Sequence, residues 1–509
     1  MKPLSRATKP LSLRTLFPAA GLSGSRDIQV NSCCHQAEDC QPGDLYVAVV
    51  DEDGDGHDTI PLAIQRGASA VMLERRVLTT VPTCLVEDTR EALGVICHQL
   101  AGNPSESLFL AGVSGTSGKT ATSQLLHSIW SQGTDPAGLM TNASYHDGQQ
   151  RFESWHSLSG PAELAHSLSQ MVQHGCQRAA VELSSQDLAF RHSAGLQLDA
   201  AILTRIRSEA GNLHGSQVNY VRAKRRLLSA LTPDGVAIIN MDDRCSCNIL
   251  ATLDRPSLTY SLYGDADVRA TVLERQPSEQ TFLLHAGNDT AVVHTRVVGD
   301  THLSHCLAAA ATSLVAGLPL AEIASGLSAL VDIPGHLQRV ECGQPFSVFV
   351  DSTNHPDTLS MRLNELGRLT SGRLICVYGP PRQAPPEQRA RLGRVVERSS
   401  AVGIITSNNT GDNSQLEIAH DVLDGYQQAS RGHIIPDRQD AICWALDQAR
   451  SGDTVLLSGK GHRSFQVTSE AIEDFDDHLV ASQWLYRRAG QQLYPDVKRA
   501  SLFVPHDVN

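Results

Sequence analysis

A glycine-rich turn that ends in Lys-Thr lies within residues 112–126, whose sequence is GVSGTSGKTATSQLL. An apolar run precedes the turn and an amphipathic stretch follows it, so we expect a strand, a loop and a helix over 119–130. Backbone N–H groups at such a helix start attract phosphate, a lysine adds charge, and a hydroxyl can bind Mg²⁺. A Gly-Ser turn that precedes Lys-Thr by chance is the alternative. The pattern predicts a nucleotide phosphate site formed by Gly115, Thr116, Ser117, Gly118, Lys119 and Thr120.

The composition is that of a globular protein with several domains. The chain has 509 residues, 41% hydrophobic and 19% charged, and it lacks an apolar run of the roughly 18 residues that cross a bilayer. The net charge of −13 argues against nucleic acid as a partner, since a phosphate backbone attracts clustered Lys and Arg. The 12 cysteines are scattered without a zinc-type CxxC pair. We interpret them as reduced, mostly buried thiols in a cytoplasmic protein.

Short apolar runs alternate with helical patterns through most of the chain, which predicts an α/β fold with parallel sheets. Three domains are expected. They are residues 1–107, a central P-loop domain over 108–333, and a C-terminal Rossmann-like domain over 334–509.

Individual elements can be placed within these domains. We expect a loose tail at 1–22, an extended stretch at 44–50, a helical segment at 60–73 and a linker at 101–107. The strands expected in the second and third domains are residues 107–113, 179–183, 200–204, 236–240, 347–352, 373–379, 402–407 and 454–459.

The glycine spacing of the phosphate loop departs from the general GxxxxGK[ST] pattern, because Val113 stands six residues before Lys119. The observed GxxGTxGKT resembles the ATP site of the Mur ligases and the folylpolyglutamate synthetases, which join an amine to a carboxylate at the expense of ATP. Further stretches resemble the Mur ligases in the same order through nearly the whole chain. They read QPGDLYVAV, VELSSQDL, TRIRSEAGNLHGSQVNYVRAKRRLL, PGHLQRVECGQPFSVFVDSTNHPDTL and LLSGKGHRSFQ.

The resemblance is greatest to the family members that add the third residue of the peptidoglycan stem peptide to UDP-N-acetylmuramoyl-L-alanyl-D-glutamate. It implies an ATP- and Mg²⁺-dependent ligase of cell-wall synthesis. A substrate carboxylate would be phosphorylated by ATP, and an amino group would attack the acyl phosphate to give an amide. The implied partners are small molecules, namely a UDP-linked muramoyl peptide or related carboxylate and an amino acid, and a monomer is favoured.

The resemblance also assigns roles to residues outside the loop. Glu182 ends an apolar run, where a strand should face the ligand crevice, and the family uses the matching Glu to hold Mg²⁺. Lys224 matches a lysine that the family carries as a carbamate near a second Mg²⁺. A solvated Glu182 and an exposed helical Lys224 are the alternatives. The implied catalytic residues are Lys119, Lys224 and Glu182, the metal ligands are Thr120, Glu182 and Lys224, and the further nucleotide contacts are Asp351 and the hinge residue Arg339.

Substrate contacts are implied in all three domains. The family's uracil-site pattern corresponds to Asn31-Ser32-Cys33, and a family TT pair corresponds to Ser159-Gly160. The family's GKGHE stretch reads GKGHR here, with Arg463 in place of the Glu. The substrate residues implied by these matches are Ser32, Ser159, Ser184, His214, Gly459, Lys460, His462 and Arg463.

Several positions depart from the family pattern. Ala210 stands where the family has a metal-binding His, and Asn408-Asn409-Thr410-Gly411 replaces the DNPR signature of diaminopimelate-adding members. Loss of that Arg and the charge reversal at Arg463 argue against meso-diaminopimelate as the incoming amino acid. Other departures are His302, His305, His336 and Asn354. A ligase with altered substrates and a weakly active or inactive paralogue with a binding role both stay open, and a plain P-loop ATPase is disfavoured.

Overall fold

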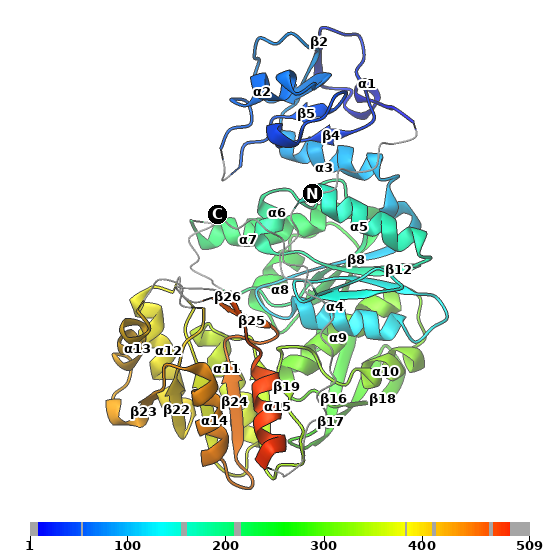
Figure 1. Ribbon diagram of the computed structural model, residues 1–509. Coiled ribbons are helices and arrows are strands. Elements are labelled where there is room, and N and C mark those ends of the chain that lie inside the picture. Colours follow the sequence, from blue (N-terminus) through cyan, green and yellow to red (C-terminus); the bar gives the residue numbers. More distant parts are fainter. Residues whose placement is uncertain are drawn as a thin grey trace. The chain divides into compact units, whose positions relative to one another are not determined.

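The computed structural model describes residues 9–51, 54–153, 160–207, 215–381, 384–409, 414–467 and 472–488 (Figure 1). The chain forms two compact units. Unit 1 comprises Met1–Glu274, Gln280–Arg296 and Asp300–Val331, and unit 2 comprises Arg275–Glu279, Val297–Gly299 and Asp332–Asn509. The finer division into three domains stays a prediction.

The large sheet of unit 1 places the strand before the phosphate loop in its interior. β8, Phe109–Ser114, pairs in parallel with β12, Arg178–Glu182, and with β13, Leu198–Leu203. The side chains of β8 point alternately to two apolar clusters, so both faces of the sheet are covered. The sheet order is β11-β10-β9-β12-β8-β13-β14-β15-β16-β17-β18. The other strands are β9 Ala137–Met140, β10 Ser144–His146, β11 Arg151–Glu153, β14 Leu231–Asn240, β15 Ser257–Ser261, β16 Val268–Arg275, β17 Gln280–Ala286 and β18 Asp289–Thr295.

Helices cover both faces of this sheet (Figure 1). On one face α4, Lys119–Trp130, packs with α9, Asp300–Val315, and α10, Leu320–Ala329, around Leu125, Ile129 and Leu307. The apolar positions of α4 recur at helical spacing, which is why one face of the helix is buried. The other face is covered by α5 Pro161–Gln173, α6 Ser185–Ala189, α7 Gln217–Arg225, η3 Arg226–Ala230 and α8 Arg244–Leu250.

A smaller sheet in the first hundred residues corrects two sequence predictions. Residues 60–73 are not one helix, because α2 ends at Gln65 and Ala70–Leu73 forms the fully buried strand β6. Gly67, at φ +108°, ends the helical path between them. The loose tail expected at 1–22 is also wrong from Leu11 on, because Leu13 is completely buried in an apolar cluster. The sheet order is β2-β7-β6-β5-β4.

The elements of this region are short, apart from one helix. They are β1 Leu11–Ser12, α1 Leu13–Leu16, β2 Gly21–Ser23, β3 Gln29–Val30, β4 Cys33–Cys34, η1 Ala37–Asp39, β5 Leu45–Val47, α2 Ile60–Gln65, β7 Thr83–Leu85 and α3 Thr89–Leu100. The expected linker at 101–107 contains the 3₁₀ turn η2, Pro104–Ser107.

Unit 2 contains a mostly parallel sheet of the Rossmann-like kind, in the order β19-β20-β24-β21-β22-β23. Its strands are β19 Gln338–Arg339, β20 Ser347–Asp351, β21 Leu374–Tyr378, β22 Val402–Ile405, β23 Gly432–Ile434 and β24 Thr454–Ser458. One apolar cluster joins the sheet to α11 Pro356–Leu369, α12 Pro386–Ser399 and α13 Gln415–Leu423, and another joins it to α14 Arg438–Gln448 and α15 Asp477–Arg488. A 3₁₀ turn, η4 Ala429–Arg431, and the hairpin β25 Phe465–Val467 with β26 Ile472–Asp474 complete the unit.

These two sheets confirm the predicted α/β class. Each strand expected in the second and third domains is present, as β8, β12, β13, β14, β20, β21, β22 and β24. Within the described ranges, every helix is too short or too polar to cross a bilayer.

Candidate active site

The phosphate loop runs from the end of β8 to the start of α4, and its glycines have no room for side chains. A Cβ atom on Gly118 would lie 2.3 Å from Nε2 of His305, and one on Gly115 would lie 1.9 Å from Oγ1 of Thr204. Gly118 also has φ +92°, which disfavours other residues. The Thr204 hydroxyl donates to the Ser117 carbonyl at 2.7 Å. The loop is therefore held in one conformation before any ligand binds.

Lys119, Thr120 and Glu182 meet at the carboxyl edge of the sheet. The Thr120 hydroxyl donates to Oε2 of Glu182 at 2.7 Å, and Nζ of Lys119 lies 3.9 Å from Oε1. Lys119 also donates to the Gly115 carbonyl at 3.2 Å. Glu182 is only 4% exposed, so the predicted alternative of a solvated strand end is wrong. A hydroxyl and a buried carboxylate side by side are oxygen donors of the kind Mg²⁺ prefers, and the pair fits that ion.

Lys224 approaches the same loop from α7. Its Nζ donates to the Gly115 carbonyl at 2.8 Å and to the Ser114 hydroxyl at 3.3 Å. The residue is 1% exposed and its ammonium lies 5.4 Å from the Tyr220 ring centroid, so the alternative of an exposed helical lysine is wrong. Its role as a carbamate and metal ligand stays a prediction.

Three predicted positions cannot be placed against this centre. Ala210 and His214, which bear on the second metal, and Ser159, a substrate position, lie outside the described residues. His305 can be placed, since its ring lies against Gly118 in the loop. The stretch that the family uses for adenine contacts thus borders the phosphate loop, with imidazoles at His302 and His305.

Asp351 is a fixed, fully buried carboxylate at the carboxyl end of β20 in unit 2. It accepts hydrogen bonds from the backbone N–H groups of Leu337 and Thr353, both at 2.9 Å, and Nε of Arg362 lies 3.3 Å away. Arg339 forms an ion pair with Glu341 at 2.9 Å. The nucleotide contacts predicted for Asp351 and Arg339 stay predictions.

The loop after β24 carries four further predicted residues. Gly459 and Gly461 both have positive φ, which turns the chain sharply around Lys460. The Asn408 amide donates to the Gly459 carbonyl and to the Gly379 carbonyl, both at 3.2 Å, and so ties two loops together. His462 is partly buried in this loop, whereas Arg463 is exposed. Gly459, Lys460, His462 and Arg463 therefore lie together at the carboxyl edge of the unit 2 sheet.

Lys460 is a buried amine in this loop. It is 1% exposed, and within the described part of the chain its Nζ has no hydrogen-bond partner. The Phe475 ring centroid lies 4.9 Å from the Nζ. Burial, together with the nearby Arg438, lowers the pKa of Lys460 to about 7. Burial also lowers the pKa of His462. In both groups the protein environment shifts the equilibrium toward the neutral form.

Below this loop lies an ion pair that the sequence did not reveal. Arg438 and Asp477 are fully buried, and the guanidinium contacts both carboxylate oxygens, at 2.6 and 2.7 Å. Arg438 also donates to the Ser407 and Ser458 carbonyls. It thus joins the two loops that end β22 and β24 to the start of α15, and it supports the region around Lys460.

A pocket of about 200 Å³ in unit 1 adjoins predicted substrate positions. Its lining includes Gly160, which follows Ser159 in the sequence, and Gln186, which stands two residues after Ser184, the N-cap residue of α6. Ser184 itself is engaged in capping, since its hydroxyl accepts from the Asp187 N–H. The rest of the lining is His35, Val49, Asp51, Arg90, Leu93, Pro161, Phe190 and His192.

This pocket contains an arginine that the sequence analysis missed. The Arg90 guanidinium lies 5.5 Å from the Phe190 ring centroid and donates to the Val50 carbonyl. Burial lowers the pKa of His35, with opposing contributions from nearby carboxylates. These residues come from separate segments without a shared motif, so spacing alone could not group them. Ser32, in contrast, does not line the pocket; its hydroxyl donates to Asp44.

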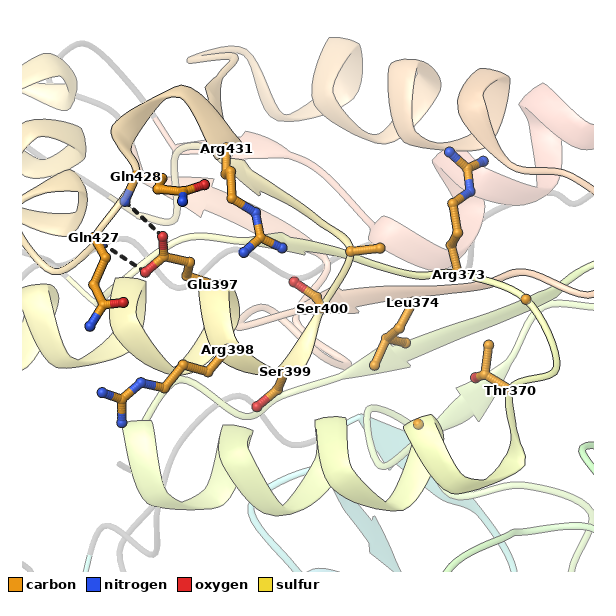
Figure 2. Close-up of a pocket in the computed structure, with 13 residues that line it drawn as sticks. Thr370, Arg373, Leu374, Glu397, Arg398, Ser399, Ser400, Gln427, Gln428 and Arg431 are labelled. Carbon is orange, nitrogen blue, oxygen red and sulfur yellow. Dashed lines mark hydrogen bonds between the residues drawn. The ribbon is translucent and has the colours of Figure 1, made fainter.

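A cavity of about 490 Å³ lies at the amino edge of the unit 2 sheet, away from the predicted residues (Figure 2). Glu397 accepts from the backbone N–H groups of Gln427 and Gln428 at 2.8 and 2.9 Å, as Figure 2 shows. Arg398 lies in the last turn of α12, where a cation complements the helix dipole. That role accounts for an arginine here without a ligand.

All 12 cysteines are free thiols, as predicted from their spacing. Six are buried and six are partly buried, so the expectation of mostly buried thiols holds for half of them. The partly buried ones are Cys33, Cys34, Cys245, Cys247, Cys342 and Cys443.

Comparison with known proteins matches both units in order. Residues 113–313 match the Mur ligase middle domain, and residues 335–461 match the Mur ligase, glutamate ligase domain. A UDP-N-acetylmuramoyl-L-alanyl-D-glutamate–2,6-diaminopimelate ligase of Geobacillus kaustophilus is 31% identical, covering 86% of this chain and 91% of that protein. The ligase of the same name from Gloeobacter violaceus is 32% identical over 94% of this chain and 99% of its own length.

Solved structures show the same fold at lower identity. A structure of a ligase with that name aligns with a TM-score of 0.70 at 23% identity, over 94% of this chain and 99% of its own. A MurF ligase from Thermotoga maritima in complex with ADP aligns with a TM-score of 0.60 at 17% identity, over 90% and 98%.

The structure has a phosphate loop on a largely parallel sheet, followed by a Rossmann-like unit. Together with the two matched Mur ligase domains, this architecture is that of an ATP-dependent acid–amino-acid ligase. The chain belongs to the Mur ligase family and is an ATP-dependent ligase of peptidoglycan synthesis. The predicted family, fold class and ligase activity are thereby confirmed.

Proposed function

We propose that this ligase joins an amino acid to UDP-N-acetylmuramoyl-L-alanyl-D-glutamate or a closely related carboxylate, as a MurE-type enzyme. The observation that carries the proposal is the cluster of Lys119, Thr120 and Glu182 on a preformed phosphate loop. The relatives that share about 30% identity over most of the chain are named as ligases that join 2,6-diaminopimelate to this acceptor, which supports the acceptor and the type of reaction. The proposal includes a monomer that acts in the cytoplasm, with domains at 1–107, 108–333 and 334–509.

The loop residues perform the phosphoryl transfer in this proposal. Backbone N–H groups of Gly115 to Gly118 and the Lys119 ammonium bind the phosphates of ATP, and Thr120 and Glu182 hold Mg²⁺. When bound, the ion neutralises charge on the phosphate oxygens. An oxygen of the acceptor carboxylate bonds to the γ-phosphorus, and the bond to the β–γ bridging oxygen breaks to release ADP. Lys119 stabilises the charge that develops on the transferred group.

Amide formation completes the reaction. The neutral amino group of the incoming amino acid attacks the acyl carbon, the bond from that carbon to the phosphate oxygen breaks, and inorganic phosphate leaves. Arg90 places a guanidinium in the lining of the unit 1 pocket, a group that suits an anionic acceptor. Ser32, Ser159, Ser184 and His214 are the other acceptor-side residues in this proposal.

The incoming amino acid is assigned to the loop after β24. Gly459, Lys460, His462 and Arg463 surround the turn there, and Asn408 replaces an acidic residue of the family signature. Arg463 presents a cation where the family has a carboxylate, so an amino acid with a distal ammonium group is disfavoured. We therefore propose a substrate other than meso-diaminopimelate.

Phosphate release tests the proposal. With ATP and Mg²⁺, the purified protein should release phosphate only when both the UDP-linked acceptor and an amino acid from a panel are present. Lys119→Ala should abolish release, whereas Lys9→Ala, at an exposed position, should not change it. Turnover that ignores both substrates would identify an ATPase. Nucleotide binding without turnover for any acceptor–amine pair would identify an inactive paralogue.

A further inference from the structure

Cys34, Cys40 and Asp44, none of which has a role in the proposed ligase reaction, form a compact donor cluster in the first sheet of unit 1. The two Sγ atoms and a carboxylate oxygen all lie within 4.8 Å of one another. Cys40 and Asp44 are 5% and 7% exposed, and Cys34 is partly buried. All three side chains come from one short segment, so they can act together without any other part of the chain.

The fold of this segment explains why the three donors meet. Cys34 ends β4, which pairs in parallel with β5 so that Cys34 lies opposite Tyr46. The 3₁₀ turn η1 lies between the two strands, and Cys40 caps it through a hydrogen bond from its N–H to the Ala37 carbonyl. Asp44 directly precedes β5. Regular backbone pairing therefore fixes the Cα positions of the donors before any ion binds.

The carboxylate of Asp44 is also held in orientation. The Gln41 N–H donates to one of its oxygens at 2.9 Å, and the Ser32 hydroxyl donates to the other. Each carboxylate oxygen has two lone pairs, so one hydrogen bond leaves each oxygen able to bind an ion. Hydrogen bonds of this kind orient the ligands of natural metal sites.

We infer that Cys34, Cys40 and Asp44 bind a thiophilic divalent cation, with zinc as the best fit. Thiolate ligands select zinc over Mg²⁺ or Ca²⁺, and zinc accepts a carboxylate as a third ligand. In a tetrahedral zinc site the ligand atoms lie about 3.5–3.8 Å apart, a spacing that small side-chain rotations can reach from the observed cluster. Binding replaces the two thiol protons, which pass to solvent, and leaves both cysteines as thiolates.

The site has three protein ligands in the part of the chain that the structure describes. The partial exposure of Cys34 leaves the fourth position to water or a small solute. Cys33, the neighbouring residue, faces the other side of β4, where its Sγ lies 3.9 Å from that of Cys97. This second thiol pair is separate from the cluster, because the side chains of successive strand residues point to opposite faces.

Cobalt substitution tests the inference, with Co²⁺ as a visible probe for the zinc site. One equivalent of Co²⁺ added to the reduced full-length protein should produce a near-ultraviolet thiolate-to-cobalt absorption band, and Zn²⁺ should displace it. Cys34→Ser and Cys40→Ser should each raise the Kd for Co²⁺ by more than the roughly 10–100-fold typical of losing an outer-sphere partner. Asp44→Asn should weaken binding while keeping the band.

Cys33→Ser is the matched control, because this thiol lies on the same strand and faces away from the cluster. It should leave the band and the affinity unchanged, and circular dichroism should show all four variants folded. Absence of the band in the wild-type protein would overturn the inference. So would a band that survives in both Cys34→Ser and Cys40→Ser, or one that is lost equally in Cys33→Ser. None of these readouts depends on ligase activity.

Discussion

The carboxyl edges of the two large sheets differ in how far their polar groups are satisfied. In unit 1, Glu182 accepts from Thr120 and lies 3.9 Å from Lys119, so acid, hydroxyl and amine are already mutually placed. In unit 2, Lys460 is buried, and no hydrogen bond to its Nζ is found among the described residues. The first edge keeps the family's Lys, Thr and Glu at Lys119, Thr120 and Glu182, whereas the second carries Asn408 and Arg463 in place of family residues. We therefore expect the phosphate chemistry to be retained and the choice of amino acid to have changed.

The prediction with the largest expected effect concerns the negative charge of Glu182. Glu182→Gln keeps a hydrogen-bond acceptor for Thr120 but removes the anionic metal ligand, so kcat/KM for ATP should fall by about 10³-fold, or about 4 kcal/mol of transition-state stabilisation. Phosphate release measured across a Mg²⁺ titration checks this. Glu322→Gln, an exposed change on α10, is the control. If Glu182→Gln retains more than a tenth of the activity, the unit 1 edge does not need its carboxylate.

Sequence alone could place the unit 1 centre because its geometry follows from topology. Thr120 and Glu182 are 62 residues apart, yet Glu182 ends β12 and Thr120 follows the loop at the carboxyl end of the neighbouring parallel strand β8. Such strand ends share one edge of a sheet. The strand, glycine loop and helix around Lys119 are all local patterns that the sequence displays directly. Both the elements and the contacts between them were therefore predictable.

The surroundings of Lys460 could not be predicted in the same way. Its environment depends on the Arg438–Asp477 ion pair, whose members are 39 residues apart and belong to helices with no common motif. Tertiary packing also buries Leu13 and makes Ala70–Leu73 a strand, whereas local patterns predicted a loose tail and a helix. Periodicity identifies elements well, but it does not report which face of a loop another segment covers.

The pH dependence of the stability of unit 2 tests whether burial of the Lys460 amine is unfavourable. A folded-state pKa of about 7 lies below the ordinary 10.5, so the unfolded chain binds more protons between these values. The burial cost of Lys460 therefore grows as pH falls from about 10.5 to 7 and is constant below. Lys460→Met should stabilise unit 2 at pH 7 by about 3 kcal/mol. The lowered pKa of Lys460 corresponds to a burial cost of roughly 5 kcal/mol, and loss of the contact between the ammonium and the Phe475 ring offsets about 1–2 kcal/mol of that gain.

Hydrogen exchange of the β24 amides at pH 7 and 10 measures this effect locally. The stabilisation by methionine should be much smaller at the higher pH, where the folded-state amine is neutral and part of the unfolded-state amine has lost its proton. A methionine variant that is less stable than the wild type by the same amount at both values would contradict the argument. It would show that Lys460 makes a favourable contact that does not depend on its charge, and that the two edges differ less than the structure indicates.

The smallest expected effect concerns the identity of the incoming amino acid. Arg463 is exposed at the turn after β24. If the incoming amino acid binds there, as proposed, the guanidinium would repel a second ammonium group on it. Arg463→Glu should shift the ratio of kcat/KM values by about 10-fold, or about 1.4 kcal/mol, toward amino acids with a distal ammonium, because one repulsive pair becomes attractive near solvent.

The ratio for Arg463→Gln should fall between those of the wild type and Arg463→Glu. Arg487→Glu, on α15, should leave the ratio unchanged. Competition assays with lysine and norleucine as paired substrates measure the ratio directly. An unchanged ratio in Arg463→Glu would show that Arg463 does not determine which amino acid is used. Asn408 and its neighbours would then be the remaining candidates at the unit 2 edge.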